Sequence, residues 1–278
     1  MRVVRADKSG FCFGVTRAIE LAREQCKTGK KVYSLGPLIH NPQVIERLEQ
    51  DGLTVIDSVE DLTSGVVVIR SHGAPSSVVE EIRTRGLEVI DATCPLVKRV
   101  QQRAASLAQD GYAVVIVGDP EHPEVRAILE DVSEAMVVDE EPPATLATAK
   151  RIGVIAQTTQ TPESFRHVVS GLLDFDFEEL RVYNTICLAT VHRQRAALDV
   201  ARSGAIDVMF VLGGRNSANT GRLAQLCQGS GVPTYHLETV RELTPEMTAG
   251  KRTAGVTAGA STPDWIIEAF VAELESRD

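Results

Sequence analysis

The stretch Leu87-Glu88-Val89-Ile90-Asp91-Ala92-Thr93-Cys94-Pro95 places one thiol between a predicted strand and a predicted helix. The apolar and β-branched residues from Leu87 to Ile90 favour a strand. Pro95 suits the first position of a helix, where no N–H donor is needed, and Asp91 and Thr93 offer side-chain oxygens to the free N–H groups. We therefore expect Cys94 at a helix N-terminus, where the helix dipole favours the thiolate, the form that attacks and binds metals.

The same order of elements occurs three times along the chain. In each copy a cysteine precedes a helix, a strand follows, and a glycine opens the loop before the next helix. From cysteine to glycine the spacing is 24 residues in the first two copies and 26 in the third. The three pairs are Cys12 with Gly36, Cys94 with Gly118, and Cys187 with Gly213.

Polar residues occupy equivalent places in two loops of each copy. Four residues after the glycines stand His40, His122 and Ser217. The next strand of each copy ends in a second polar loop, and these loops are Ser71-His72-Gly73, Gln157-Thr158-Thr159 and Ala258-Gly259-Ala260-Ser261. Since ligands of parallel α/β sheets bind beyond the carboxyl ends of the strands, both loops belong to candidate sites.

The alternation of strands and helices predicts an α/β fold with parallel sheets. We expect three similar α/β units, at residues 13–93, 94–186 and 187–278, with the third unit completed by the N-terminal strand within residues 1–12. Packing of these units around a pseudo-threefold axis, with the loops inward, would bring the three cysteines to a central site.

Composition limits the possible partners and the compartment. The 278 residues carry a net charge of -9, which disfavours nucleic-acid binding. The start of the chain lacks the apolar core of a signal peptide, and no apolar run reaches the roughly 18 residues of a membrane span. The five cysteines are odd in number and form no CxxC pair. We therefore expect a cytoplasmic protein without a disulfide framework, a nucleic-acid partner or a membrane partner.

Three equivalent thiols form a candidate metal site. An iron-sulfur cube bound by three cysteines keeps one iron free for substrate, whereas zinc on three thiolates normally takes a fourth ligand. Cys26 and Cys227 lie off the repeat position and are interpreted as packing residues. The remaining histidines match no repeat position and are interpreted as surface or packing residues; they are His167, His192 and His236.

The loop side chains predict a site for an anion. His40, His72 and His122 stand near helix starts, whose free N–H groups bind phosphates. Neutral donors are added by Ser217, Asn219, Thr158 and Ser261. Glu124 has two readings, a first-turn carboxylate that favours the helix dipole or a proton donor with Thr158 as a hydroxyl relay. The chain has neither a Walker lysine loop nor a GxGxxG segment.

Eight segments together carry a resemblance to a known family over nearly the whole chain. They are Gly10-Phe-Cys-Phe-Gly-Val15, Ile39-His-Asn-Pro-Gln-Val44, Ser71-His-Gly73, Asp91-Ala-Thr-Cys-Pro-Leu-Val97, His122-Pro-Glu-Val125, Gln157-Thr-Thr159, Asn216-Ser217 with Asn219, and Gly255-Val-Thr-Ala-Gly-Ala-Ser261. With these segments the chain resembles the LytB family of 4-hydroxy-3-methylbut-2-enyl diphosphate reductases.

The resemblance implies an oxidoreductase of the non-mevalonate isoprenoid pathway. It implies a 4Fe-4S cluster on Cys12, Cys94 and Cys187, with one iron that no cysteine binds and that takes the C4 hydroxyl of the substrate. Reductive removal of that hydroxyl would give isopentenyl and dimethylallyl diphosphates, with electrons from a ferredoxin or flavodoxin. The implied diphosphate ligands are His40, His72, His122, Ser217, Asn219 and Ser261. The implied proton donor is Glu124, assisted by Thr158 and by His122 beside it.

Three departures from the family pattern keep other readings open. Ala218 stands where a second serine is common, Arg126-Ala127 replaces a usual glycine-ended motif, and His192 replaces a common asparagine. One alternative is a LytB-like paralogue that dehydroxylates another allylic or aromatic diphosphate. Another alternative is a non-catalytic iron-sulfur sensor that uses the three cysteines without turnover.

Overall fold

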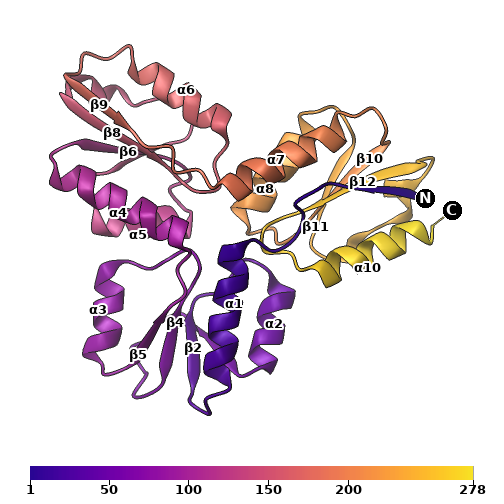
Figure 1. Cartoon of the computed structure of the whole chain (residues 1–278), viewed down its shortest axis with the longest axis horizontal. Helices are drawn as coiled ribbons and strands as arrows, with labels where there is room; N and C mark the ends of the chain where they lie inside the picture. Colours follow the sequence, from indigo (N-terminus) through magenta and orange to yellow (C-terminus); the bar gives the residue numbers. More distant parts are fainter. Residues whose placement is uncertain (278) are drawn as a thin grey trace. The chain divides into compact units, whose positions relative to one another are not determined.

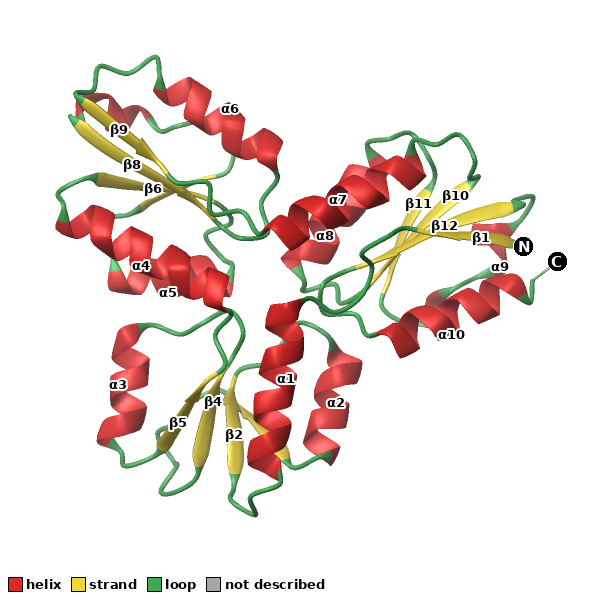
Figure 2. Ribbon diagram, viewed as in Figure 1, coloured by secondary structure: helices red, strands yellow, loops and turns green. Residues whose placement is uncertain are grey.

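The computed structural model describes residues 1–277 and contains three sheets of four strands each. All strand pairs are parallel, and helices flank both faces of each sheet (Figures 1 and 2). The expected α/β class with three similar parallel-sheet units is therefore confirmed.

The first sheet has the strand order β3-β2-β4-β5. Its strands are β2 (Val32–Leu35), β3 (Leu53–Ile56), β4 (Val66–Ile69) and β5 (Glu88–Asp91), with helices α1 (Phe13–Cys26), α2 (Pro42–Gln50) and α3 (Ser76–Thr84). The central strand β4 is buried along its whole length, which explains its unbroken run of apolar residues. Ile82 of α3 packs against Val67 and Ile69 of β4 in the core cluster of this sheet.

The second sheet repeats this order as β7-β6-β8-β9. Its elements are α4 (Pro95–Gln109), β6 (Ala113–Val117), α5 (Pro123–Asp131), β7 (Met136–Val138), the 3-10 helix η1 (Ala144–Thr148), β8 (Arg151–Ala156), α6 (Pro162–Leu172) and β9 (Glu179–Val182). Leu107 of α4 lies so close to Gly153 of β8 that a Cβ at Gly153 would meet it at 2.6 Å. The helix therefore packs directly on the backbone of the central strand.

The third sheet joins the two ends of the chain, in the order β1-β12-β10-β11. Its elements are β1 (Arg2–Arg5), α7 (Leu188–Ala201), β10 (Val208–Leu212), α8 (Ala218–Gln228), β11 (Thr234–Leu237), η2 (Val240–Glu242), α9 (Pro245–Thr248), β12 (Thr253–Ala258) and α10 (Asp264–Glu275). Strand β1 pairs with β12 from Arg2 opposite Thr253 to Arg5 opposite Val256. The N-terminal strand thus supplies an edge of a sheet whose other strands come from the last quarter of the chain.

By contacts the chain forms two compact units, which we describe separately. The terminal unit contains residues 1–16, 39–47 and 188–278, and the central unit contains residues 17–38 and 48–187. The first two sheets lie in the central unit and the third lies in the terminal unit. The unit boundaries 13–93, 94–186 and 187–278 stay a prediction.

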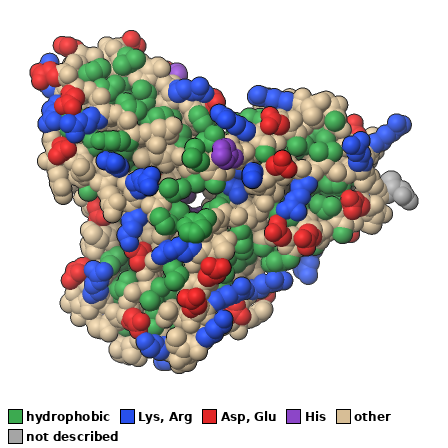
Figure 3. Space-filling view, viewed as in Figure 1, with side chains coloured by type: hydrophobic (Ala, Val, Ile, Leu, Met, Phe, Trp, Pro, Cys, Tyr) green, Lys and Arg blue, Asp and Glu red, His purple; other side chains and the backbone are tan. Residues whose placement is uncertain are grey.

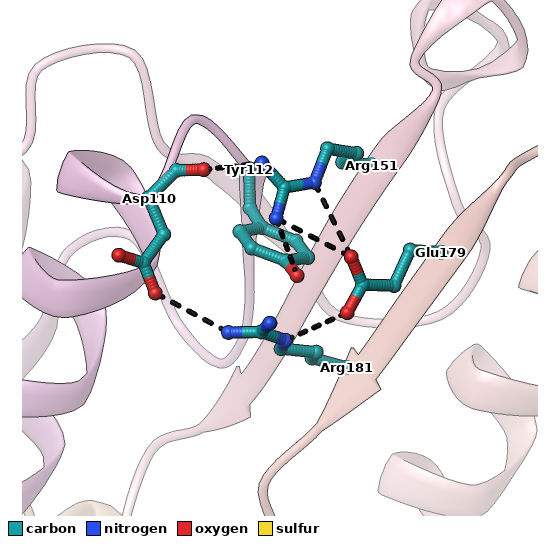
Figure 4. Close-up of polar contacts among 5 residues, drawn as sticks. All are labelled: Asp110, Tyr112, Arg151, Glu179 and Arg181. Carbon is teal, nitrogen blue, oxygen red and sulfur yellow. Dashed lines mark hydrogen bonds and ion pairs between the residues drawn. The ribbon is translucent and has the colours of Figure 1, made fainter.

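A network of charged side chains covers the amino ends of strands in the second sheet (Figure 4). Arg151 donates to the hydroxyl of Tyr112 at 2.9 Å and to Glu179 at 3.3 Å. Arg181 donates to Glu179 at 2.9 Å and to Asp110 at 3.2 Å, and both guanidinium groups lie over the Tyr112 ring. Because this network lies at the strand ends opposite to the polar loops, we assign it to packing rather than to a ligand site.

Charged side chains of both signs lie on the face that Figure 3 draws, where they are interspersed. Among the described helices, none is both long enough and apolar enough to span a bilayer.

Candidate functional site

The three repeat cysteines occupy equivalent positions in the backbone. Each is a half-buried cysteine outside any disulfide and directly precedes a helix: Cys12 precedes α1, Cys94 precedes α4 and Cys187 precedes α7. Each cysteine N–H donates to a carbonyl in the loop that follows the central strand of a sheet. The acceptors are Ala260 for Cys12 at 3.1 Å, Ser71 for Cys94 at 3.0 Å and Thr158 for Cys187 at 3.0 Å. The repeat seen in the sequence therefore extends to individual hydrogen bonds.

The expected capping of α4 by Asp91 or Thr93 is wrong. The N-cap is Cys94 itself, and no side chain caps the helix. Asp91 instead accepts from the Thr93 N–H at 3.0 Å and forms an ion pair with Lys98. The carboxylate prefers this local turn because the acceptor lies only two residues from the donor. No side-chain oxygen thus occupies the N–H groups at the start of α4.

The loop glycines also share one hydrogen bond. The N–H groups of Gly36, Gly118 and Gly213 donate to the carbonyl of the last residue of the neighbouring edge strand. The acceptors are Ile56, Val138 and Leu237, at 2.8, 3.0 and 3.0 Å. This bond fixes where each loop leaves its strand. In the third copy, a ring nitrogen of His236 also contacts the Gly213 carbonyl at 2.9 Å, so this histidine stabilises the glycine loop.

His40 differs in position from the two residues with which the spacing aligns it. His122 and Ser217 are the N-caps of α5 and α8, whereas Asn41 accepts from the Val44 N–H at the start of α2. His40 therefore lies one residue before its helix cap. The physical reason is that the first glycine loop is one residue longer, so the count of four residues from Gly36 does not reach the cap.

Glu124 of α5 is the most perturbed acid of the central unit. Its side chain is buried, and both carboxylate oxygens are bound by Thr158: the N–H donates to Oε1 at 2.8 Å and the hydroxyl donates to Oε2 at 2.7 Å. Burial raises the pKa of Glu124 to about 7, although the two bonds from Thr158 act in the opposite direction. A carboxyl with such a pKa can hold a proton at neutral pH and release it again.

Thr158 connects this acid to a cysteine. Its N–H and hydroxyl bind Glu124, while its carbonyl accepts from the Cys187 N–H at 3.0 Å. One residue therefore fixes the distance between the buried acid and the loop of the third thiol. The contact between Glu124 and Thr158 that the sequence predicted is present, and their role stays a proposal.

Two of the predicted histidines meet within the central unit. The rings of His72 and His122 lie edge to face, with centroids 5.6 Å apart. The Nδ1 atom of His122 accepts from the Glu124 N–H at 3.2 Å. In the neutral ring the proton then sits on Nε2, which makes Nε2 a donor for an anion.

Four other predicted residues lie in the terminal unit. Ser261 donates to the carbonyl of His40 at 3.0 Å, and a Cβ at Gly214 would meet that same carbonyl at 2.5 Å. Ser217 is the N-cap of α8, and Asn219, two residues further along, is buried. Among the described residues the Asn219 Nδ2 donor has no hydrogen-bond partner. A buried amide donor of this kind normally has a partner, so the geometry suits an acceptor-rich ligand.

The residues that depart from the family pattern do not crowd these loops. Arg126 is exposed and forms an ion pair with Glu121, and His192 is exposed on α7. Ala218 is the first residue of α8, a position whose backbone N–H stays available to a ligand whatever the side chain.

The cysteines off the repeat have the character of packing residues. Cys227 is fully buried in α8, and burial raises the pKa of its thiol to about 11. Burial, followed by the charge of Asp51, also raises the pKa of Cys26. Both groups therefore stay protonated thiols at neutral pH, unlike metal-binding thiolates.

One positioning residue was missed by the sequence reasoning. Gln157 is buried and accepts from the Asp119 N–H at 2.9 Å, while its amide donates to the Thr159 hydroxyl at 2.6 Å. It thereby ties the glycine loop of the second copy to the loop after β8. The sequence signal for this role is its place in the Gln157-Thr158-Thr159 loop, as the first residue after a central strand.

These features define an α/β protein with three equivalent cysteine loops, a pair of histidines in contact and a buried acid. A family model described as LytB protein matches residues 3–275, and the chain belongs to this family. The chain is 45% identical to a 4-hydroxy-3-methylbut-2-enyl diphosphate reductase of Pelobacter propionicus, over 99% of this chain and 98% of that protein. It is 44% identical to a protein of the same name from Geobacter metallireducens, over 100% and 98% of the two chains.

Two solved structures are similar over nearly the whole chain. One is (E)-4-hydroxy-3-methyl-but-2-enyl diphosphate reductase, described as the terminal enzyme of the non-mevalonate pathway, with 42% identity, a TM-score of 0.70 and 99% of both chains covered. The other is the E-1-hydroxy-2-methyl-but-2-enyl-4-diphosphate reductase of Plasmodium falciparum, with 26% identity, a TM-score of 0.90 and coverage of 99% and 88%.

Proposed function

We propose that this protein reduces 4-hydroxy-3-methylbut-2-enyl diphosphate to isopentenyl and dimethylallyl diphosphates. The C4–O bond breaks, two electrons and two protons are consumed, and the oxygen leaves as water. The observation that carries this proposal is the hydrogen-bonded series Glu124–Thr158–Cys187, because it fixes a proton-holding acid to the loop of a repeat thiol. Relatives that share 44–45% of the sequence have this activity in their names.

A 4Fe-4S cluster is the proposed cofactor, held by Cys12, Cys94 and Cys187 with one iron free of cysteine. The residues fit such a group because all three cysteines lie outside any disulfide, are half-buried and are equivalent in the backbone. When bound, the cluster supplies the electrons and a Lewis-acidic iron for the hydroxyl of the substrate.

The protein's own residues then have two tasks. We propose that His40, His72, His122, Ser217, Asn219 and Ser261 bind the diphosphate, with the Asn219 amide and the His122 Nε2–H as donors. Glu124 holds a proton and passes it to the substrate through the Thr158 hydroxyl, which lies 2.7 Å from its Oε2. Burial keeps a large fraction of this carboxyl protonated near pH 7.

The electrons require a low-potential partner, and we propose a ferredoxin or flavodoxin in the cytoplasm. Anaerobic incubation of the iron-loaded protein with the named substrate and a strong chemical reductant tests the proposal. We expect both diphosphate products, together with about four irons per chain. A fully loaded protein that releases neither product would reject the activity.

The ligand set has its own test in single cysteine variants. Cys94→Ser should lose most of its iron, because a serine hydroxyl is a poor substitute for a thiolate. Cys26→Ser removes a thiol off the repeat and should keep the iron content of the parent protein. Equal iron in both variants would show that Cys94 is not a ligand.

A further inference from the structure

Arginine side chains contact the segments that precede the cysteines. Arg17 lies on α1, the helix that follows Cys12, yet its guanidinium donates to two carbonyls next to Cys94. The acceptors are Thr93 at 3.2 Å and Asp91 at 3.3 Å. The Arg17 guanidinium thus binds two backbone carbonyls in the turn that precedes Cys94.

Arg193 makes the corresponding contact to the first cysteine. It lies on α7, the helix that follows Cys187, and donates to the carbonyl of Gly10 at 2.8 Å. Arg193 is only 4% exposed, so its guanidinium is shielded from water. Gly10 has a φ of 101°, a conformation that glycine adopts readily and an L side chain rarely does, so the direction of its carbonyl depends on glycine at this position.

The third segment has a weaker counterpart. Arg103 lies on α4, the helix that follows Cys94, and its guanidinium carbon is 4.7 Å from the ring centre of Tyr183, four residues before Cys187. The contacts therefore follow a cyclic order along the chain. The helix after each repeat cysteine carries an arginine that contacts the segment before another one.

We propose that Arg17 and Arg193 are positioning residues for the thiols of Cys94 and Cys12. Each fixes a cysteine loop through its backbone carbonyls and places a permanent positive charge near the thiolate. Arginine suits this task because its guanidinium stays charged and offers several N–H donors in one plane. The part of the proposal that concerns reduction rests on the proposed cluster: positive charge favours its more negative, reduced form and so raises its reduction potential.

The test compares variants within the same helices of the full-length protein. Arg193→Met removes the charge and the donors but keeps much of the apolar volume, and Arg193→Lys keeps the charge without the planar group. Arg195→Met is the matched control, because it removes an exposed arginine two residues away on α7. Arg17→Met with Arg23→Met forms a second pair on α1, where Arg23 binds Asp51 at the surface.

The first readout is backbone hydrogen exchange at Cys12, whose N–H donates to Ala260, and at Cys94, whose N–H donates to Ser71. We expect exchange at Cys12 to become at least about tenfold faster in Arg193→Met and to stay unchanged in Arg195→Met, since a hydrogen bond from a charged group is worth about this factor or more. Exchange at Cys94 should respond in the same way to Arg17→Met. Exchange equal to the controls in both variants would overturn the positioning role.

The second readout is the midpoint potential of the iron-loaded protein, from an anaerobic redox titration followed by electron paramagnetic resonance. We expect a lower potential in Arg193→Met, a potential near that of the parent in Arg193→Lys, and no change in Arg195→Met. Faster exchange with an unchanged potential would overturn the electrostatic part. If the parent protein binds no cluster, the proposed function fails while the exchange data still decide the positioning role.

Discussion

The Glu124 carboxyl changes the dependence of folding on pH. Its pKa rises from 4.5 to about 7 in the folded protein because of burial. Between these values the unfolded chain has released the proton that the folded chain still holds, so the free energy of unfolding falls as the pH rises. The loss amounts to about 3 kcal/mol once both states are ionised.

Glu124→Gln should remove this pH dependence. The amide keeps the shape and can still accept from the Thr158 N–H, but it has no proton to release. The free energy of unfolding of the variant minus that of the parent should rise by about 3 kcal/mol from pH 4 to pH 8. Denaturant titrations at the two pH values measure this difference, and an equal difference at both would contradict a raised pKa.

The same substitution should separate activity from stability. General acids contribute about 10²–10⁴ in rate, so turnover of the diphosphate should fall by this factor in Glu124→Gln. Iron content should stay that of the parent protein, because the carboxyl is bound by Thr158 and is not a proposed ligand of the cluster. Near-normal turnover with normal iron would remove Glu124 from the role of proton donor.

Thr158 permits a finer test of the same acid. Thr158→Val removes the hydroxyl that lies 2.7 Å from Oε2 but keeps the N–H bond to Oε1. Because the lost bond favours the ionised form, the pKa of Glu124 should rise further, and the alkaline limb of the rate profile should move to higher pH. Thr158→Ser restores the hydroxyl and should restore the profile. A profile that is identical in all three proteins would show that the hydroxyl does not tune the acid.

The close packing of helix α4 on strand β8 depends on glycine, which has no side chain, at position 153. A Cβ at Gly153 would meet the Leu107 side chain at 2.6 Å. Gly153→Ala should therefore lower the free energy of unfolding by about 1–3 kcal/mol, the usual cost of overpacking a core. Gly221→Ala is the control, because no atom lies within 4 Å of its Cβ position and alanine favours the α8 helix by roughly 0.5–1 kcal/mol. A higher free energy of unfolding in Gly153→Ala than in the parent protein would contradict the close packing.

At this scale the sequence predicted the strands and helices well where apolar residues recur with a clear period. The strand predicted at residues 87–90 is β5 in the structure, at Glu88–Asp91, so its bounds differ by one residue. The edge strand β3 was missed, since four residues with mixed burial give no distinct period. The capping of α4 was also predicted wrongly, because Asp91 forms a local turn that sequence spacing does not distinguish from a cap.

The candidate site was predictable to a similar degree, and for a similar reason. Residues that repeat in equivalent loops were found by spacing, and the contacts of Thr158 with Glu124 and of His72 with His122 agree with their expected closeness. Residues that act from another part of the chain were not found. Arg193 contacts Gly10 across 183 positions of sequence, and no local pattern reports such a contact.

For the whole molecule, cluster binding should couple to folding. A group that binds the folded chain and not the unfolded chain stabilises it, by about 2.7 kcal/mol at one hundred times its dissociation constant. Anaerobic removal of iron with a chelator should therefore lower the melting temperature of the parent protein. Cys94→Ser should melt at the lower temperature with or without chelator. An unchanged melting temperature of the parent protein after iron removal would contradict this coupling.

The pairing of β1 with β12 also has a consequence for biosynthesis. The ribosome releases residues 2–5 well before their partner strand, which emerges some 250 residues later. The N–H of Cys12 must likewise wait for the carbonyl of Ala260. A nascent chain can thus complete its first two sheets while its first thiol loop still lacks the backbone that shapes it. Delivery of iron by the cell should consequently follow the synthesis of Ala260, and an mRNA truncated before the codon for Ala260 should yield a chain that acquires no iron.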